Sequence, residues 1–175
     1  MKRSVVFFTL FLTAAACSSV RVLETQAESG FRVSDYKTFN FLEVEGAGDT
    51  SGSFDRNANL IKQSIAKELS TKGLSHTPSN ADLLVNIGIV VEEKVQTRET
   101  NIREAPRYLG QRRYSWKSEE VEVGRYKEGT VTVHLVDAKT KKMVWQGVVE
   151  GTIPSKQEKL ADRIDEGVDE LFAQL

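Results

Sequence analysis

The sequence predicts an α+β fold: a two-layer sandwich in which two helices pack on one face of a mainly antiparallel sheet of about five strands. Three observations support this class. Two segments carry apolar residues at helical spacing, the segments between them alternate apolar and polar residues, and short polar turns separate neighbouring strands. The predicted order is β-α-β-β-β-β-α. Because each amphipathic helix needs an apolar partner, we expect both helices on the same sheet face.

The first strand and the first helix are predicted between residues 36 and 72. Residues 36–44 alternate Phe39 and Phe41 with polar neighbours, which is typical of a strand with one buried face. In residues 54–72 the apolar positions follow a helical stripe: Phe54, Ala58, Ile61, Ile65 and Leu69. Gly73 follows where a helix favours a left-handed glycine, so we expect the helix to end there.

Four strands and the last helix are predicted from residue 81 onwards. Alternation is strongest in residues 81–99, and we expect further strands at 113–126, 130–136 and 143–153, with a polar turn at 137–140. In residues 143–153 one face is formed by Met143, Trp145, Val149 and Ile153. Ser155 and Glu158 have capping-box spacing, and they precede an apolar stripe of Leu160, Ile164, Val168, Leu171, Phe172 and Leu175.

The sheet face away from the helices is predicted to be partly apolar. Its expected residues are Thr38, Leu42, Asn86, Gly88, Val90, Thr132, His134, Val136, Val144 and Val148. A face of this composition is suited to contact with a partner.

The N-terminus has the layout of an export signal. Lys2 and Arg3 precede an uncharged run over residues 5–16, which is well short of the roughly 20 residues of a membrane-spanning helix. Three alanines lead to Cys17, the single cysteine of the chain. We therefore predict a lipoprotein signal peptide at 1–16, a lipidated Cys17 with a tether over 17–30, and one domain at 31–175. Cleavage after Ala16 by an ordinary signal peptidase is the alternative, because Ala14 replaces the usual Leu.

Charge, cysteine content and the residues after Cys17 limit the partners, the disulfides and the location to be expected. Of the 24 basic residues, Lys2 and Arg3 leave with the signal peptide, so 22 face 25 acidic residues and the formal charge is −3. This balance does not favour nucleic acid as a partner. A single cysteine allows no internal disulfide. Ser18 and Ser19 follow Cys17 without an aspartate, and by resemblance to proteobacterial sorting this favours the outer membrane, facing the periplasm.

Five segments together resemble the bacterial lipoprotein family called domain of unknown function 4136. They are residues 36–42, 61–74, 81–89, 126–147 and 163–171, and the most specific piece is Gly129–Trp145. The resemblance implies an α+β fold and a lipid anchor, and it implies no activity. Such proteins often carry a Gly- and Tyr-rich stretch before residue 126, whereas residues 98–114 are Arg-rich here.

The sequence does not present a readable active site. His76 and His134 belong to no metal-binding spacing, and the Gly-rich residues 46–53 lack the lysine of a phosphate loop, so we expect no metal and no cofactor. Five glutamates could instead lie on paired strands: Glu92, Glu93, Glu119, Glu120 and Glu122. Cross-strand ion pairs with nearby Lys and Arg are the simpler interpretation, and a hydrolytic carboxylate pair is the alternative.

One segment, residues 98–116, combines arginines with aromatic side chains. The candidate binding residues are Arg103, Arg107, Tyr108, Arg112, Arg113, Tyr114 and Trp116, a mixture suited to anionic glycans, phosphates or lipid headgroups. A solvated hairpin tip is the alternative. We expect this segment to project beyond the sheet, because the strands before and after it are longer than their neighbours.

The predicted function is therefore that of a non-enzymatic, lipid-anchored envelope protein. It would bind an envelope protein, a glycan or a lipid headgroup through the Arg-rich segment or the open sheet face. The alternative is a hydrolase or transferase that acts on envelope polymers with a carboxylate pair.

Overall fold

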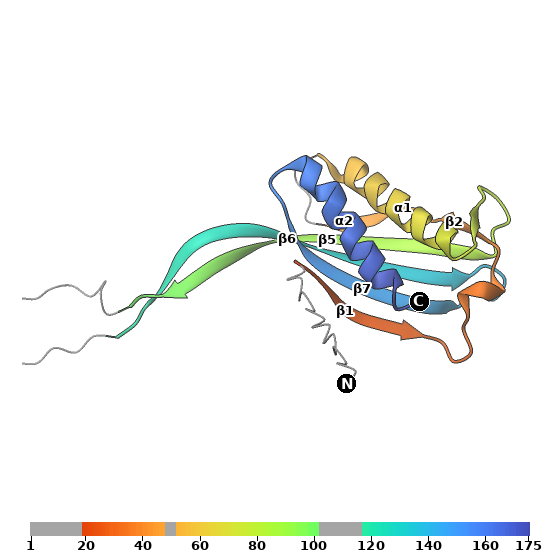
Figure 1. Ribbon diagram of the computed structural model, residues 1–175, viewed down its shortest axis with the longest axis horizontal. Helices are drawn as coiled ribbons and strands as arrows, with labels where there is room; N and C mark the ends of the chain where they lie inside the picture. The colour runs from red at the N-terminus through yellow and green to blue at the C-terminus, as the bar shows by residue number, and fades with distance from the viewer. Residues whose placement is uncertain (1–18, 48–51, 102–116) are drawn as a thin grey trace, which may run out of the picture.

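The computed structural model describes residues 19–47, 52–101 and 117–175. Within them a seven-stranded sheet carries two helices on one face (Figure 1). The elements are β1 (Val20–Ala27), a short 3-10 helix (Val33–Asp35), β2 (Thr38–Phe41), β3 (Glu45–Ala47), α1 (Phe54–Thr71), β4 (Ser75–His76), β5 (Leu83–Glu99), β6 (Glu120–Asp137), β7 (Met143–Ile153) and α2 (Gln157–Phe172).

The sheet is mixed, which corrects the expectation of about five mainly antiparallel strands. The strand order is β1-β7-β6-β5-β2-β4, and β3 also pairs with β5. β1, β7, β6 and β5 pair antiparallel, whereas β2 and β3 run parallel to β5 and β4 runs parallel to β2. The reason is that α1 forms the crossover from β2 and β3 to β5, and a helical crossover returns the chain in the same direction.

β1 replaces most of the tether that we expected before residue 31. Val20–Ala27 pairs antiparallel with β7, from Val20↔Gly151 to Ala27↔Trp145. Apart from Val20 and the half-buried Val22, its side chains are exposed, and a bulge between Val22 and Glu24 interrupts the register. An exposed edge strand has no apolar alternation, and for this reason its sequence resembles a linker.

β6 is one continuous strand, where we expected two strands at 113–126 and 130–136. It pairs with β5 from Leu83↔Asp137 to Glu99↔Glu120. Gly129 lies in the middle of β6 and pairs with Val91 and Gly151, so this glycine does not end the strand. The described part of the strand begins at Glu120.

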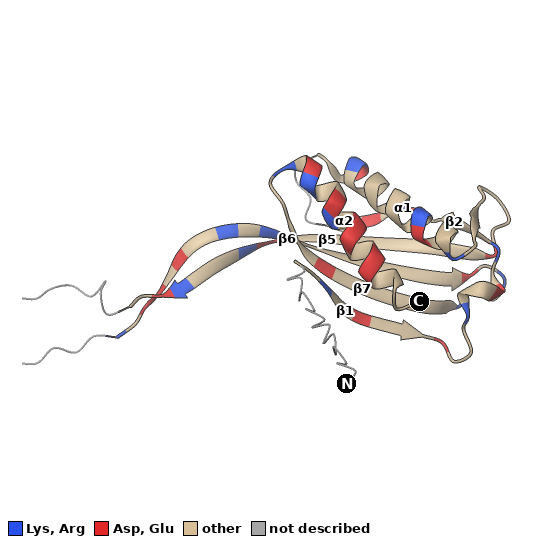
Figure 2. Cartoon of the chain, in the orientation of Figure 1, with Lys and Arg blue, Asp and Glu red and all other residues tan. Residues whose placement is uncertain are grey.

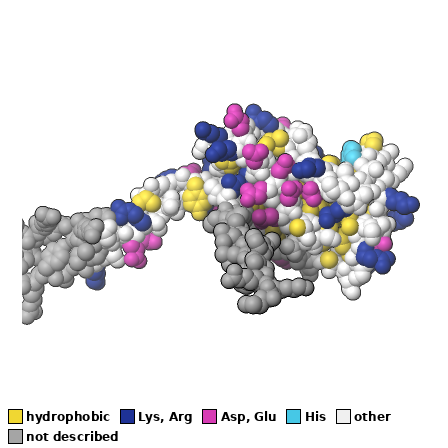
Figure 3. Space-filling view, in the orientation of Figure 1, with side chains coloured by type: hydrophobic (Ala, Val, Ile, Leu, Met, Phe, Trp, Pro, Cys, Tyr) yellow, Lys and Arg dark blue, Asp and Glu magenta, His cyan; other side chains and the backbone are white. Residues whose placement is uncertain are grey.

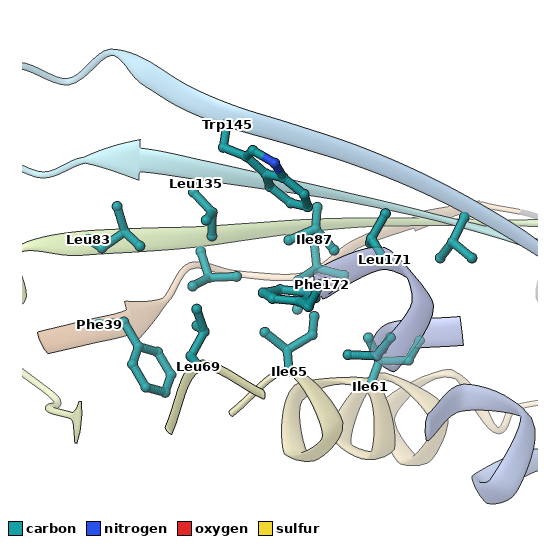
Figure 4. Packing of buried hydrophobic residues seen from close by; sticks show 14 of the residues in the cluster. Phe39, Ile61, Ile65, Leu69, Leu83, Ile87, Leu135, Trp145, Leu171 and Phe172 are labelled. Atoms are coloured by element: carbon teal, nitrogen blue, oxygen red, sulfur yellow. The ribbon is translucent and has the colours of Figure 1, made fainter. Parts of the chain in front are cut away.

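The core lies between the sheet and the two helices (Figure 4). Ile61, Ile65 and Leu69 of α1 pack towards the alternating side chains of β5, and Leu171 and Phe172 of α2 pack beside them. Trp145 of β7 is 2% exposed, and its ring centroid lies 5.6 Å from that of Phe172. The predicted burial of Trp145 beneath the helices is confirmed.

Of the two predicted helix-capping motifs, the one at the end of α1 is present and the one at the start of α2 is absent. At the end of α1, Gly73 has φ +92°, its N–H donates to the Ser70 carbonyl, and the Leu74 N–H donates to the Leu69 carbonyl. These bonds form a Schellman motif, as Gly73 predicted. The expected capping box before α2 is absent, because the N-cap residue is Lys156 and it makes no side-chain capping bond.

A bulge in β7 corrects the predicted faces near its start. Leu135 pairs with Trp145 but Val136 pairs with Met143, so Val144 has no partner in the register. Val144 is consequently buried at 6% exposure and Met143 is 45% exposed, the reverse of the expected assignment. Leu42 and Val90 of the open face are exposed, as expected.

Candidate binding surfaces

The most distinctive feature of the molecule is a two-stranded extension of β5 and β6, which we call the arm. It comprises residues 94–99 of β5 and 120–126 of β6, paired from Lys94↔Tyr126 to Glu99↔Glu120 (Figure 1). Among the described residues, β7 accompanies β6 only as far as Lys127, and β3 accompanies β5 only as far as Val90. At about 3.3 Å per residue the arm is ~20 Å long, and no other described strand pairs with either of its edges.

Basic and acidic residues are interspersed along the arm and its root (Figure 2). Lys94 pairs with Glu92 and lies 3.9 Å from Glu128, while Arg125 pairs with Glu122 at 2.7 Å and with Glu93 at 3.5 Å. The pairs Lys94–Glu128 and Arg125–Glu93 are the cross-strand ion pairs that the sequence favoured, whereas Lys94–Glu92 and Arg125–Glu122 lie within one strand. Apart from the half-buried Glu128, the paired side chains are exposed, so solvent screens these pairs and each contributes little to the stability of the fold.

The glutamates considered as a carboxylate pair occupy this exposed ribbon. Glu92 and Glu93 lie at the arm root, and Glu119, Glu120 and Glu122 lie toward its far end. The hydrogen bond from Lys94 lowers the pKa of Glu92, and the positive charge of Lys94 lowers it further. A general acid for glycoside hydrolysis needs a raised pKa and a cleft. Glu92 is therefore unsuited to that role.

Apolar side chains are also exposed on the arm. Val95 is 50% exposed, Val123 48% and Tyr126 38%. Apolar side chains stand out between the charged ones along the ribbon in Figure 3. An exposed valine on a strand without neighbours contributes little to folding, so these residues are available to a partner.

The residues that the sequence singled out for binding lie outside the described part of the chain. They are Cys17 in the N-terminal segment, and Arg103, Arg107, Tyr108, Arg112, Arg113, Tyr114 and Trp116 in residues 102–116. The described hairpin ends where the Thr100 N–H donates to the Glu119 carbonyl at 2.9 Å. The far end of the arm therefore carries both attachment points of the Arg-rich segment.

The two histidines are separate. His76 in β4 packs its ring against Phe39 and Phe41, with centroids 5.5 and 5.9 Å away. His134 is half-buried on the open sheet face, where its register neighbours are Asn86 and Gln146. Among the described residues no three His, Cys, Asp or Glu side chains come together in a way that could hold a metal ion.

The outer surface of α2 is acidic. Figure 3 shows acidic side chains gathered over this helix, and its sequence contains Glu158, Asp162, Asp165, Glu166, Asp169 and Glu170. This surface repels anions, so an anionic partner would have to approach another part of the molecule. No helix in the described ranges is long and apolar enough to cross a membrane.

Sequence reasoning missed two connected hollows at the arm root. One is an apolar cavity of about 100 Å³ between the helices and the sheet, and the other is a groove of about 780 Å³ beside it. Their walls come from β1, α1, β5, β6, β7 and α2. Only the tertiary fold brings these segments together, so no local pattern could have identified the site.

The chain matches a known protein family over most of its length. The profile described as domain of unknown function (DUF4136) matches residues 23–175. The chain belongs to the DUF4136 family. The match begins inside β1, so residues 23–27 of the edge strand lie within the DUF4136 domain. No curated protein shows significant similarity to this DUF4136 chain.

Solved structures share the DUF4136 fold at low sequence identity. A PDZ domain protein from Parabacteroides distasonis is similar at TM-score 0.51 and 15% identity, over 90% of this chain and 36% of that one. The chain thus corresponds to about a third of that protein. The PelC dodecamer from Paraburkholderia phytofirmans is similar at TM-score 0.51 and 13% identity, over 88% of this chain and 95% of that one. At these identities the comparison concerns the fold alone.

Proposed function

We propose that this DUF4136 protein is a lipoprotein of the bacterial envelope, anchored through Cys17 in the outer membrane and facing the periplasm. The support is the export signal and the small residues before Cys17. β1 begins three residues later, so at most ~10 Å of chain separates the lipid from the folded domain. The anchor therefore holds the domain against the membrane without a long tether.

The anchor and the arm leave from the same end of the sheet. Val20 pairs with Gly151, Gly151 with Gly129, and Gly129 with Val91, which forms one row across β1, β7, β6 and β5. The arm begins three residues after Val91. A lipid on Cys17 would consequently keep the arm root next to the bilayer, and this shared end is the observation that carries the proposal.

We infer that the protein works as a binding module without catalysis, and that the arm presents residues 102–116 to an acidic component of the envelope. Arginine forks recognise phosphate and carboxylate groups in pairs of hydrogen bonds, and aromatic rings add stacking surface. The arm extends beyond the core and adds nothing to it, so its length is best explained by contact with a partner. The acidic residues of α2 lie over the sheet, whereas the arm extends away from the body (Figure 2).

The anchor is tested by Cys17→Ser. The acyl chains supply most of the attachment energy, so the substituted protein should move from the membrane fraction to the soluble periplasmic fraction. Persistent membrane attachment after cleavage at the same site would show that lipid on Cys17 is not the anchor.

The arm is tested by replacing Arg103, Arg107, Arg112 and Arg113 together with Ser. Retention on isolated envelopes should fall at low salt, and wild-type retention should itself fall as salt rises, because the contacts are ionic. Vesicles with and without anionic lipid separate headgroup binding from protein or glycan binding. Unchanged retention at both salt concentrations, with the fold intact, would show that residues 102–116 form a solvated loop without a role in binding.

A further inference from the structure

One apolar side chain of the arm has no partner in the strand pairing. The register of β5 with β6 passes from Gln96↔Gly124 to Thr97↔Glu122. Val123 lies between these two pairs, at a β-bulge, and it is 48% exposed. A bulge re-aims the side chain that it carries, and a half-exposed valine contributes little to folding. Val123 is therefore available to insert into a partner.

The two hollows at the arm root match such a side chain in size and polarity. The cavity holds about 100 Å³ and is lined mainly by aliphatic side chains, among them Ile61, Ile89, Val131 and Ile164. Apolar cavities of this order stay dry and accept small apolar groups. The cavity opens into the groove of about 780 Å³, because five residues line both: Asn57, Val91, Thr152, Ile153 and Leu160. A chain segment that lies in the groove can therefore place one aliphatic side chain in the cavity.

The groove also has an excess of positive charge. Six charged side chains around the two hollows are taken up by ion pairs of 2.8, 3.5 and 3.6 Å: Glu150 with Arg21, Glu93 with Arg125, and Arg163 with Glu166. Arg56 and Lys127 line the groove as well, and neither forms an ion pair with a described residue. Both are exposed. Two cations without a counter-ion favour an acidic segment as the occupant of the groove.

The arm is acidic around Val123. Residues 119–125 contain three glutamates and one arginine, a formal charge of −2. Arg125 is held by ion pairs within its own chain, whereas Glu119 and Glu120 are exposed and form no ion pair with a described residue. The arm thus offers an apolar side chain near two carboxylates without a counter-ion. This is the complement of an apolar cavity near two cations without a counter-ion.

The order of charges along the chain favours a second copy as the partner. Beyond residues 119–125 the arm sequence becomes basic, because residues 102–117 contain five basic residues and one acidic residue. Beyond the groove the body becomes acidic, because α2 begins at Gln157 in the groove wall and contains six acidic and two basic residues. An arm that runs along a second copy from its groove towards α2 would meet opposite charges at both steps.

The arm cannot fill the groove of its own chain. Arg125 and Tyr126 at the arm root line that groove, and the strand extends from them away from the body (Figure 1). Val123 is two residues from Arg125, and an extended strand cannot fold back over so short a distance. An arm that occupies the groove must therefore come from another molecule.

We propose that the arm of one copy docks in the groove of a second copy, with Val123 in the apolar cavity. The acidic residues 119–120 then lie beside Arg56 and Lys127. The proposal rests on the proposed function of the arm, and it names α2 of the second copy as the acidic partner of residues 102–116. Each copy has one arm and one groove, so the contacts run head to tail and the assembly grows into a closed ring or a longer chain.

The test is sedimentation velocity of the Cys17→Ser protein over a range of concentrations, because this substitution removes the acyl chains and the need for detergent. Species larger than a monomer should form as the protein concentration rises. Self-association should weaken as salt rises, because part of the contact is ionic.

A matched pair of variants tests the arm side of the contact. Val123→Ser should weaken self-association about tenfold, because it removes the apolar side chain that fills the cavity. Val95→Ser is the control. It lies on the other strand of the same arm, is 50% exposed and keeps a regular partner in Arg125, so it should leave self-association unchanged.

A second pair tests the groove side. Arg56→Glu combined with Lys127→Glu should weaken self-association about tenfold or more, because both carboxylates of the incoming arm would meet like charge. Lys139→Glu combined with Lys142→Glu makes the same change in net charge at exposed positions of the turn between β6 and β7, outside the groove. This control should self-associate like the parent protein.

A mixture of the two impaired proteins tests the head-to-tail geometry. The Val123→Ser protein keeps an intact groove, and the protein with Arg56→Glu and Lys127→Glu keeps an intact arm. One contact of full strength can form between them, so the mixture should give dimers and no larger species.

Three results would overturn the proposal. The first is a protein that stays monomeric at every concentration; envelope retention that still depends on the four arginines would then leave the proposed function standing with a different partner. The second is self-association that both the Val123→Ser and the groove variants leave unchanged, which would place the interface elsewhere. The third is a mixture that forms no dimer, or that forms larger species, which would exclude the head-to-tail contact.

Discussion

β5 and β6 pass through two environments, and the contrast between them separates folding from function. In the body, Leu83, Val85 and Ile87 of β5 are at most 1% exposed under the helices. In the arm the same strand continues with Val95 at 50% exposure and no third strand beside it among the described residues. Strand pairing is continuous across the boundary, so the backbone ladder does not depend on the core. Side-chain burial stabilises these strands only as far as the arm root. The arm must therefore be retained for a reason other than the stability of the fold.

The largest predicted difference between the body and the arm is the loss of stability when a side chain is truncated to alanine. Trp145→Ala should lower the free energy of unfolding by about 3–5 kcal/mol, because a fully packed indole is removed beneath α2. Val95→Ala in the arm should change it by less than about 0.5 kcal/mol. Denaturant unfolding of both variants measures the difference. Comparable losses would mean that the arm is part of the cooperative core.

A pair of glycines gives a smaller contrast. Gly73→Val should cost about 1–2 kcal/mol, because φ +92° is unfavourable for an L residue although no atom lies within 4 Å of the new Cβ. At Gly124 in the arm, the added Cβ would meet only the Gln96 side chain at 3.8 Å, and φ is not in the left-handed region. Gly124→Val should leave the melting temperature unchanged or raise it slightly. A destabilised Gly124→Val would reveal packing on the arm that the fold does not explain.

The smallest predicted effect is on pH dependence. Partial burial raises the pKa of Glu68 in α1, and the nearby Asp169 carboxylate of α2 raises it further. A raised folded-state pKa gives stability that is present below the ordinary carboxyl pKa and lost as pH rises through the folded value. Glu68→Gln should therefore raise the melting temperature at pH 7 and leave it unchanged at about pH 3.5.

The arm control for this prediction is Glu92→Gln. The pKa of Glu92 is lowered by Lys94, so its contribution has the opposite sign and is lost as pH falls. Because this pair is exposed, solvent screens it, and no measurable shift is expected at either pH. A clear decrease at pH 7 for Glu92→Gln would show that arm ion pairs stabilise the body.

The local sequence pattern was sufficient to predict the helices and strands that bury one face. The helix over residues 54–72, the Gly73 cap and the strand at 143–153 matched the structure, because each has an apolar stripe or a turn residue of its own. β1 was missed because its exposed side chains follow no period, and the parallel pairing of β2 was missed because α1 was not considered as a crossover.

The candidate sites differed in how far sequence could locate them. The extension of two strands beyond their neighbours followed from the unequal lengths of the predicted strands, and the described pairing of β5 with β6 confirms it, while residues 102–116 lie outside the described part of the chain. The cavity beside Arg163 depends on contacts between segments more than 100 residues apart, from Val20 to Val168. Such a site has no sequence signal, since none of its residues is unusual in its own segment.

The central claim is that the arm contacts a partner and does not hold the fold together. Its most direct test is a shortened protein in which residues 95–125 are replaced by Asn-Gly, a two-residue turn suited to joining Lys94 to Tyr126. Both the melting temperature and crosslinking in intact envelopes are measured against wild type. We predict a melting temperature within a few degrees of wild type and loss of the crosslinked species. A shortened protein that unfolds, or that keeps every crosslink, would contradict the claim.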